Sequence, residues 1–349
     1  MKRRNWIAIL VVMLFVLVSL VLSGCGQKQA AEKEVKGTAQ AAKTIRISCA
    51  MPTTYPSYKE LEEFSRLVSE RSKGALKVEI YPTATLYKDS DAVEAVASGA
   101  VEMVSVPYFY ASRIIPQLRL FELPYLTTKE DVWFKIYDGE IGKNIAQHLE
   151  AKGLKLLGWN HVSTNGTGFE TKKPVSVPGD MKGMKIRSMS TTDAAIISAC
   201  GATPVSLSAS DLYIALQRGT IDGATGCASH IIDRKLYEVT SYMTDLKLVT
   251  ATYMILMNKQ FFDSLTPKLQ KIIMDAGREV DLQSRPEWTR LIEEEYIPKA
   301  KEKGFTFINP TPEQMAQWQK VFDQVYVKVY QEVPELKELV AEVKKLEKE

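Results

Sequence analysis

The residue with the clearest chemistry is Arg187, which ends a short predicted strand (185–187) directly before a predicted helix (192–200). Its guanidinium group is planar and always charged, and its paired N–H groups match the two oxygens of a carboxylate. Ligands of open α/β sheets collect beyond the carboxyl ends of the strands, which is where this residue is placed. We therefore interpret Arg187 as a candidate carboxylate-binding residue. The alternative is a surface arginine in a weak salt bridge.

Six further side chains lie where a binding cleft could form. They follow predicted strands, stand close to Arg187 in the sequence, or come after the Asp222-Gly223 turn. Rings and apolar groups at such positions can form the walls of a ligand pocket. Each could equally pack in a core or face solvent. These candidates are Tyr55, Tyr108, Trp159, Asn165, Met189 and Cys227.

Signatures of catalysis and of metal binding are missing from the sequence. It has no Gly-rich phosphate loop, no Gly-x-Ser-x-Gly turn and no Rossmann fingerprint. The three histidines, His148, His161 and His230, do not have metal-binding spacing. A triad dispersed along the chain stays open, because triad partners need not be close in sequence. We expect no catalytic residue, no metal and no cofactor.

The elements that must position these side chains follow an α/β order. Apolar alternation and helical spacing give strand, helix, strand, helix and strand over 45–107, which is typical of a sheet with parallel strands. A mixed order continues to the C-terminus. Later strands are predicted at 154–159, 185–187, 220–222, 246–257 and 305–308. Helices are predicted at 131–137, 141–152, 192–200 and 208–218, from 267 with interruptions near Pro286 and Pro298, and from 311 and 335.

The N-terminus has the pattern of a secretory signal. Lys2, Arg3 and Arg4 precede an uncharged stretch, 6–22, and residues 1–24 are predicted to be a signal peptide. Residues 22–25, Leu-Ser-Gly-Cys, resemble the lipobox of bacterial lipoproteins, in which the cysteine, here Cys25, receives a lipid. Residues 25–43 are predicted to form the lipidated cysteine and a flexible tether. The alternative is an uncleaved anchor helix, and both interpretations place the rest of the chain outside the cytoplasm.

Composition excludes several classes of protein. With 349 residues, 45% hydrophobic and 25% charged, the chain is neither disordered, nor collagen-like, nor a polytopic membrane protein. Without the three basic residues at its start it has equal numbers of basic and acidic residues, and it lacks a basic stripe for nucleic acid. Cys200 and Cys227 could form a disulfide, or Cys49, Cys200 and Cys227 could be buried free thiols.

Four segments, in order along residues 45–257, resemble the substrate-binding proteins of tripartite ATP-independent periplasmic (TRAP) transporters, the DctP-like group. The most specific is PGDMKGMKIR at 178–187, similar to the family's P-x-D-L-K-G-x-K-I-R, with GATPV following at 201–205. The others are VEIYP at 78–82 with 92–103, FELPYL at 121–126, and DLYIALQ at 211–217 with Asp222-Gly223.

This resemblance implies a periplasmic-binding-protein-like α/β fold with a cleft between two lobes. Lobe I is expected at 44–164 plus about 253–292, and lobe II at 165–252 plus about 293–349. It also implies that Arg187 binds the carboxylate of an organic acid, that the lobes close on the ligand, and that the protein then docks on TRAP membrane subunits. Two alternatives use the same cleft: a ligand-binding module for a sensor or signalling partner, and an exported enzyme.

Two departures from the family pattern bear on the ligand. Many relatives carry a second arginine in the turn that here reads Thr164-Asn165-Gly166-Thr167, and an asparagine where this chain has the segment 224–227. A missing cation argues against a second anionic group on the ligand. We therefore expect a monocarboxylate, or an acid with a neutral second half, in preference to a short dicarboxylate.

Overall fold

The computed structural model describes residues 42–163 and 165–348. The predicted signal peptide, Cys25, the alternative anchor helix and nearly all of the tether lie outside these residues. Within the described part of the chain, no helix is long and apolar enough to cross a membrane.

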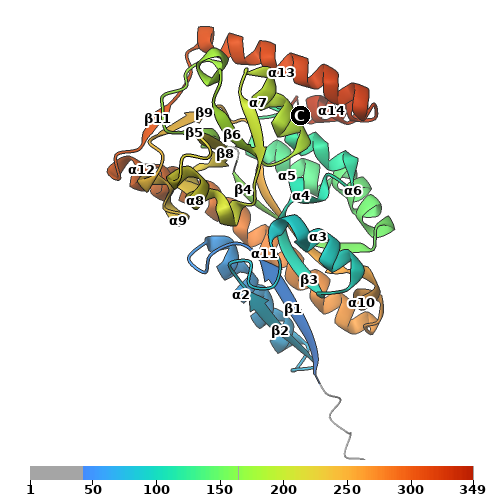
Figure 1. Ribbon diagram of the computed structural model, residues 1–349. Helices are drawn as coiled ribbons and strands as arrows, with labels where there is room; N and C mark the ends of the chain where they lie inside the picture. The colour runs from blue at the N-terminus through green and yellow to red at the C-terminus, as the bar shows by residue number, and fades with distance from the viewer. Residues whose placement is uncertain (1–41, 164, 349) are drawn as a thin grey trace, which may run out of the picture. The chain divides into compact units, whose positions relative to one another are not determined.

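The first sheet has five strands in the order β2-β1-β3-β10-β4 (Figure 1). The parallel arrangement predicted for the first three strands is confirmed, because β1 pairs in parallel with both β2 and β3. β10 pairs antiparallel with β3 and β4, so the sheet is mixed. The strands are β1 (Lys43–Cys49), β2 (Leu76–Tyr81), β3 (Met103–Pro107), β4 (Leu154–Ser163) and β10 (Ala251–Asn258).

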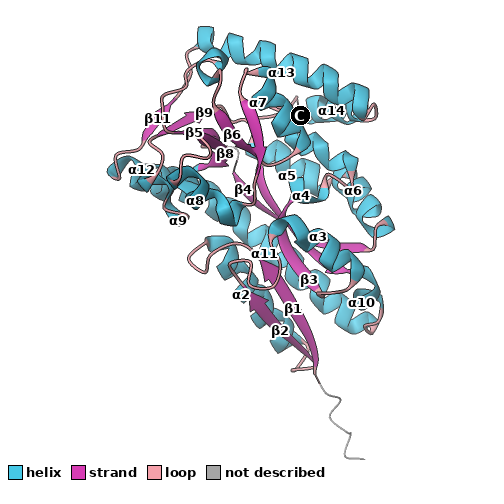
Figure 2. Cartoon of the chain, in the orientation of Figure 1, coloured by secondary structure: helices cyan, strands magenta, loops and turns pink. Residues whose placement is uncertain are grey.

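The second sheet has six short strands in the order β11-β9-β5-β8-β6-β7, and it forms a separate group of strands in Figure 2. β6 pairs in parallel with β7 and β8, whereas β5 pairs antiparallel with β8 and β9. The strands are β5 (Thr167–Thr171), β6 (Lys185–Ser188), β7 (Thr203–Ser206), β8 (Gly223–Cys227), β9 (Tyr242–Asp245) and β11 (Thr306–Ile308). The sequence did not predict β5, β7 or β9, and it placed the strand at 220–222 just before β8.

Helices cover both sheets. α2 shows why these segments are helical: Pro56 opens its first turn, and Leu61, Phe64 and Val68 follow at helical spacing and are buried. The helices are α2 (Pro56–Arg71), α3 (Asp89–Ser98), α4 (Tyr108–Ala111), α5 (Glu130–Asp138), α6 (Glu140–Ala151), α7 (Thr191–Ala199), α8 (Leu212–Gln217), α9 (Ala228–Asp233), α10 (Lys259–Asp263), α11 (Pro267–Leu291), α12 (Ile297–Glu302), α13 (Pro312–Glu332) and α14 (Leu336–Leu346). Short 3-10 turns lie at Pro116–Glu122, Pro178–Met181, Ala209–Asp211 and Leu236–Glu238, and a π-helical turn lies at Ile292–Tyr296.

Two sequence-based expectations about these elements are wrong. Pro286 lies inside α11, which runs without interruption from Pro267 to Leu291. The strand expected from residue 246 begins only at Ala251, because the segment before it is the connection that arrives from the second sheet.

The chain passes three times between the two sheets. It does so after β4, after β9, and through the long helical segment from α11 to β11. Two buried clusters hold the elements together: one packs the first sheet against α2 and α11, and the other extends from α3, α5 and α6 to α7 and α13. The exact lobe boundaries stay a prediction.

Candidate ligand-binding site

A cavity of about 40 Å³ lies between the two sheets. Side chains from elements of the first sheet and of the second sheet face each other across it. Its lining comprises Tyr55, Asp89, Pro107, Tyr108, Phe109, Thr167, Arg187, Met189, Ala209, Gly226, Cys227, His230 and the segment 249–253.

Arg187 is the only Lys or Arg in this lining, and its side chain is 1% exposed. Nε donates to the Leu207 carbonyl at 3.0 Å and Nη2 to the Tyr110 hydroxyl at 3.4 Å. Nη1 lies 3.5 Å from the Thr225 carbonyl, so two of these three contacts are long. Within residues 42–163 and 165–348, no carboxylate forms an ion pair with Arg187. A buried cation held by neutral acceptors is able to take an anionic partner from solution.

The motif residues around Arg187 have structural roles in this chain. Asp180 accepts hydrogen bonds from the amides of Ser176 and Val177, which closes the turn before β6. Asp222 accepts from the Lys185 amide at 2.8 Å and fixes the start of β6. These contacts set the register of β6, and with it the place where the Arg187 side chain enters the cavity.

The start of α7 fixes the chain directly after Arg187. Ser190 is its N-cap, accepts from the Asp193 amide, and donates to Glu122 at 2.7 Å. Asp193 accepts from the Met189 amide and the Thr225 hydroxyl, both at 2.8 Å. Burial raises the pKa of Asp193 to about 6. Glu122 belongs to the FELPYL segment, so its hydrogen bond with Ser190 connects this segment to the loop that follows Arg187.

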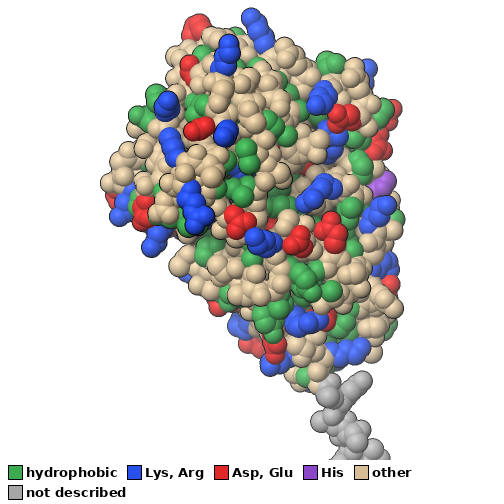
Figure 3. All heavy atoms as spheres, in the orientation of Figure 1, with side chains coloured by type: hydrophobic (Ala, Val, Ile, Leu, Met, Phe, Trp, Pro, Cys, Tyr) green, Lys and Arg blue, Asp and Glu red, His purple; other side chains and the backbone are tan. Residues whose placement is uncertain are grey.

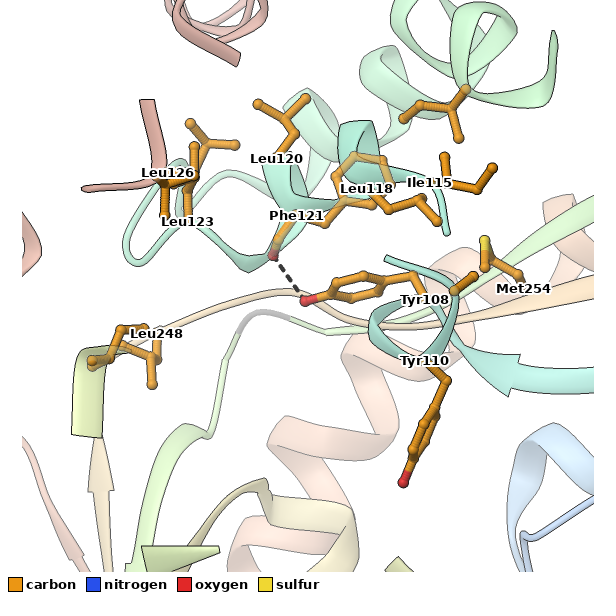
Figure 4. Close-up of a cluster of buried hydrophobic side chains, with 14 of the residues drawn as sticks. Tyr108, Tyr110, Ile115, Leu118, Leu120, Phe121, Leu123, Leu126, Leu248 and Met254 are labelled. Atoms are coloured by element: carbon orange, nitrogen blue, oxygen red, sulfur yellow. Dashed lines mark hydrogen bonds between the residues drawn. The ribbon is translucent and has the colours of Figure 1, made fainter. Parts of the chain in front are cut away.

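One wall of the cavity is aromatic, formed by Tyr55, Tyr108, Phe109 and Tyr253. Tyr108 donates its hydroxyl proton to the Phe121 carbonyl at 2.8 Å. Figure 4 shows this bond, and it shows Tyr110 of the same short helix pointing in another direction. The Tyr55 hydroxyl lies 2.9 Å from the Ser229 hydroxyl, so this pair, like Arg187 and Tyr110, joins the two walls.

Three ionisable groups lie in or behind the cavity. Asp89 is 3% exposed, and burial raises its pKa to about 6. Glu170 is fully buried under Gly226, neither carboxyl oxygen has a hydrogen-bond partner among the described residues, and burial raises its pKa to about 8. Burial lowers the pKa of His230 well below its usual value. At neutral pH the site therefore combines the Arg187 cation, an ionised Asp89, and uncharged Glu170 and His230.

The structure brings five of the seven candidates together. Arg187, Tyr55, Tyr108, Met189 and Cys227 line the cavity, whereas Trp159 and Asn165 do not. Trp159 packs in the core, with ring centroids 5.3 Å from Phe121 and 5.1 Å from Tyr137. Asn165 donates to Glu293 at 2.7 Å.

Sequence reasoning missed Asp89, Phe109, His230 and Tyr253. Asp89 had a usable signal, because it begins a helix after the second strand, the kind of position that singled out Tyr55 and Tyr108. No signal in the sequence singled out Tyr253, because the strand was expected to begin at residue 246 and its true start in the first sheet was therefore misplaced. Cys49, Cys200 and Cys227 are free and buried, so Cys200 and Cys227 form no disulfide.

No group of three or more His, Cys, Asp or Glu residues in the described part of the chain could hold a metal ion. The face drawn in Figure 3 carries interspersed acidic and basic side chains without a large patch of one sign.

Comparison with protein families gives one match across most of the chain. A family model described as bacterial extracellular solute-binding protein, family 7, matches residues 47–333. The C4-dicarboxylate-binding periplasmic protein DctP of Rhodobacter capsulatus is 30% identical over 293 residues, covering 81% of this chain and 85% of that protein.

Solved structures agree with this match. A TRAP periplasmic solute binding protein of Sulfurospirillum deleyianum with bound succinate superposes with a TM-score of 0.81 and 27% identity, covering 88% of this chain and 100% of that one. One from Chromohalobacter salexigens with bound D-glucuronate has a TM-score of 0.81 and 25% identity, covering 86% of this chain and 99% of that one. These similarities confirm the predicted two-lobe, periplasmic-binding-protein-like fold.

Proposed function

Because the chain belongs to family 7 of the bacterial extracellular solute-binding proteins, we propose that it binds a small organic acid through one carboxylate at Arg187. It then delivers the acid to the membrane subunits of a TRAP transporter. One observation carries the site assignment: Arg187 is a buried cation in the cavity between the two sheets, and no carboxylate of the described residues pairs with it.

The strength of such contacts fits this role. A hydrogen bond to a charged group contributes roughly 1.5–3 kcal/mol, so a bidentate pair supplies about 3–6 kcal/mol. Micromolar affinity requires about 8 kcal/mol. The remainder can come from apolar contact with the rings of Tyr55, Tyr108 and Tyr253.

The ligand we propose is a monocarboxylate. Relatives differ on this point: the R. capsulatus protein is named for C4-dicarboxylates and one solved relative holds the dicarboxylate succinate, whereas another holds the monocarboxylate D-glucuronate. Arg187 is the only basic Lys or Arg side chain in the lining of this cavity, so a second carboxylate would lack a cationic partner there. Tight binding of succinate, with no response to monocarboxylates, would reverse this assignment.

Capture then requires the two walls to separate and close. Direct contacts, Tyr55 with Ser229 and Arg187 with Tyr110, join the walls, and a cavity of about 40 Å³ has little room for an acid to enter. The three crossings between the sheets are the natural hinges. Lobes I and II, with the boundaries expected from the sequence, are the bodies that move.

The protein acts outside the cytoplasm. Family membership supports an extracytoplasmic location, and we propose that Cys25 is lipidated and that residues 26–43 tether the binding body to the membrane. Its action is capture without chemistry, so we propose no catalytic residue and no cofactor. The sensor module and the exported enzyme are not proposed.

The test is ligand-induced thermal stabilisation of purified protein, after mass spectrometry has identified the acid retained on purification. Arg187→Ala should abolish the stabilisation, and Arg187→Lys should keep a minor part of it because a point charge lacks the planar fork. Arg218→Ala is the matched control, because Arg218 is exposed on the second sheet's side. Unchanged affinity in Arg187→Ala would remove the site assignment.

A further inference from the structure

The cavity contains one buried anion as well as one buried cation. Asp89, at the start of α3, and Arg187, at the end of β6, both line it and are 3% and 1% exposed. Neither side chain forms an ion pair with the other, or with any other charged side chain of the described residues. We propose that this cavity selects a zwitterion, a monocarboxylate whose carboxylate binds Arg187 and whose cationic nitrogen binds Asp89. This inference rests on the proposed function; it keeps the expected single carboxylate and replaces the expected neutral second half with a cationic one.

The surroundings of Asp89 keep it ionised at neutral pH. Arg234 and Arg187 attract its charge, and the Ala50 amide supports it, so that burial raises its pKa only to about 6. The other titratable groups that interact with it, Cys49, Tyr110 and Tyr253, have raised pKa values and stay neutral. Lys88, its neighbour in the chain, is turned to Asp211 at 3.0 Å and is exposed.

A buried carboxylate without an ion-pair partner is unfavourable. A plain monocarboxylate would bring a second negative charge into the same small cavity and would be repelled by Asp89. An acid with a cationic nitrogen avoids this conflict, because it gives each buried charge an opposite partner. The two buried charges of the site thus favour a ligand that carries one positive and one negative charge.

The aromatic wall supports the same class of ligand. Tyr55, Tyr108, Phe109 and Tyr253 line the cavity from the first sheet's side, which is also the side of Asp89. The faces of aromatic rings attract cations, and a carboxylate together with several rings is a recurrent receptor for substituted ammonium groups. The cationic end of the ligand therefore points towards the first sheet, and its carboxylate points towards the second.

Affinity measurements on matched ligand series test this assignment. Straight-chain acids of increasing length are compared in three forms, ω-amino, ω-hydroxy and unsubstituted, by calorimetry. We expect the ω-amino form of the best-fitting length to bind at least tenfold more tightly than the other two. Asp89→Asn should lower the affinity for the ω-amino acid at least tenfold. It should leave the affinity for the unsubstituted acid unchanged or raise it. Asp91→Asn, an exposed change in the same first turn of α3, should alter neither.

The pH profile of the unmodified protein gives a second readout that needs no variant. As pH falls from about 7.5 to about 5.5, Asp89 becomes protonated. The amino acid should then bind more weakly, because its cation loses a partner, whereas the unsubstituted acid should bind more tightly, because repulsion is relieved. A merely structural Asp89 would move both affinities in the same direction.

Two results would overturn the inference: equal affinity for the three forms, or an Asp89→Asn variant that weakens all of them equally. Preference for the ω-hydroxy acid would also overturn it, because a hydroxyl donor would then be the partner of Asp89. Failure of the proposed function looks different. In that case none of the acids binds, or Arg187→Ala leaves their affinity unchanged.

Discussion

Glu170 shows how a single residue couples the site to pH. Its carboxyl group is fully buried beneath Gly226, where a Cβ atom would come within 2.2 Å of Oε1, and its pKa is raised to about 8. The Arg187 and Arg234 guanidinium groups oppose this rise. Glu170 is therefore a proton-bearing neighbour of Arg187 at neutral pH and leaves the guanidinium charge available to a ligand.

Replacing Glu170 by glutamine should increase stability at alkaline pH. The folded protein holds the Glu170 proton up to about pH 8, whereas the unfolded chain releases it near 4.5. The free energy of unfolding therefore falls as pH rises through this window, by about 1.4 kcal/mol per pH unit for one proton. Urea denaturation should find Glu170→Gln close to the wild type at pH 5 and more stable than it at pH 8. Equal differences at both pH values would contradict the buried proton, and the exposed change Glu94→Gln is the control.

At the residue scale, the sequence correctly predicted those site residues whose place in the cavity depends only on their position along the backbone. Arg187, Tyr55 and Tyr108 were found because each lies at the end of a strand or directly after one, and such positions converge between the sheets. Trp159 also ends the strand predicted for its segment, yet β4 continues to Ser163 and Trp159 turns into the core. The direction of a side chain depends on strand length and register, and these are not visible in spacing alone.

At the element scale, two glycines allow α11 to pack closely against β4. A Cβ atom on Gly277 would come within 2.6 Å of the Leu157 carbonyl oxygen, and one on Gly158 within 2.9 Å of the Gly277 carbonyl oxygen. The helix and the strand can approach this closely only without side chains. α11 leads into one of the crossings between the sheets, so its packing against β4 also positions one of the proposed hinges.

Gly277→Ala should lower the free energy of unfolding by about 1–3 kcal/mol, because α11 must move away from β4. This loss should exceed the gain of about 1 kcal/mol that alanine brings to a helix interior. Gly179→Ala is the matched control, because nothing lies within 4 Å of its Cβ and we expect a change of no more than about 0.5 kcal/mol. Chemical denaturation measures both. An unchanged Gly277→Ala variant would show that the two elements are free to separate.

The elements themselves were predictable in proportion to their length and periodicity. The stretch from β1 to β3 alternates clearly, and its parallel pairing was predicted correctly. β5, β7 and β9 are four or five residues long, and β5 starts inside a Gly-Thr-Gly sequence that is typical of a turn. Such strands are defined by their neighbours in the sheet, so single-sequence patterns cannot reveal them.

At the scale of the whole molecule, we expect the reactivity of Cys227 to report on the proposed opening of the cavity. It lines the cavity, it is buried, and its pKa is raised to about 11, so its thiol reacts slowly while the walls are closed. Cys49 and Cys200 are also buried but do not line the cavity, and they serve as internal controls.

Saturating ligand should slow maleimide labelling of Cys227 strongly and labelling of Cys49 and Cys200 much less, as followed by mass spectrometry of each site. The physical reason is that the ligand holds the walls together, whereas the two control residues become exposed only by unfolding. If the ligand slowed all three cysteines by the same factor, separation of the walls would not be the route to the cavity.

The most direct measurement is a crystal structure of the protein with the acid it retains on purification. We predict that both carboxylate oxygens lie within hydrogen-bond distance of the Arg187 guanidinium group, with the rest of the ligand against the aromatic wall. A ligand bound outside the cavity, or an Arg187 side chain turned towards bulk solvent, would contradict it.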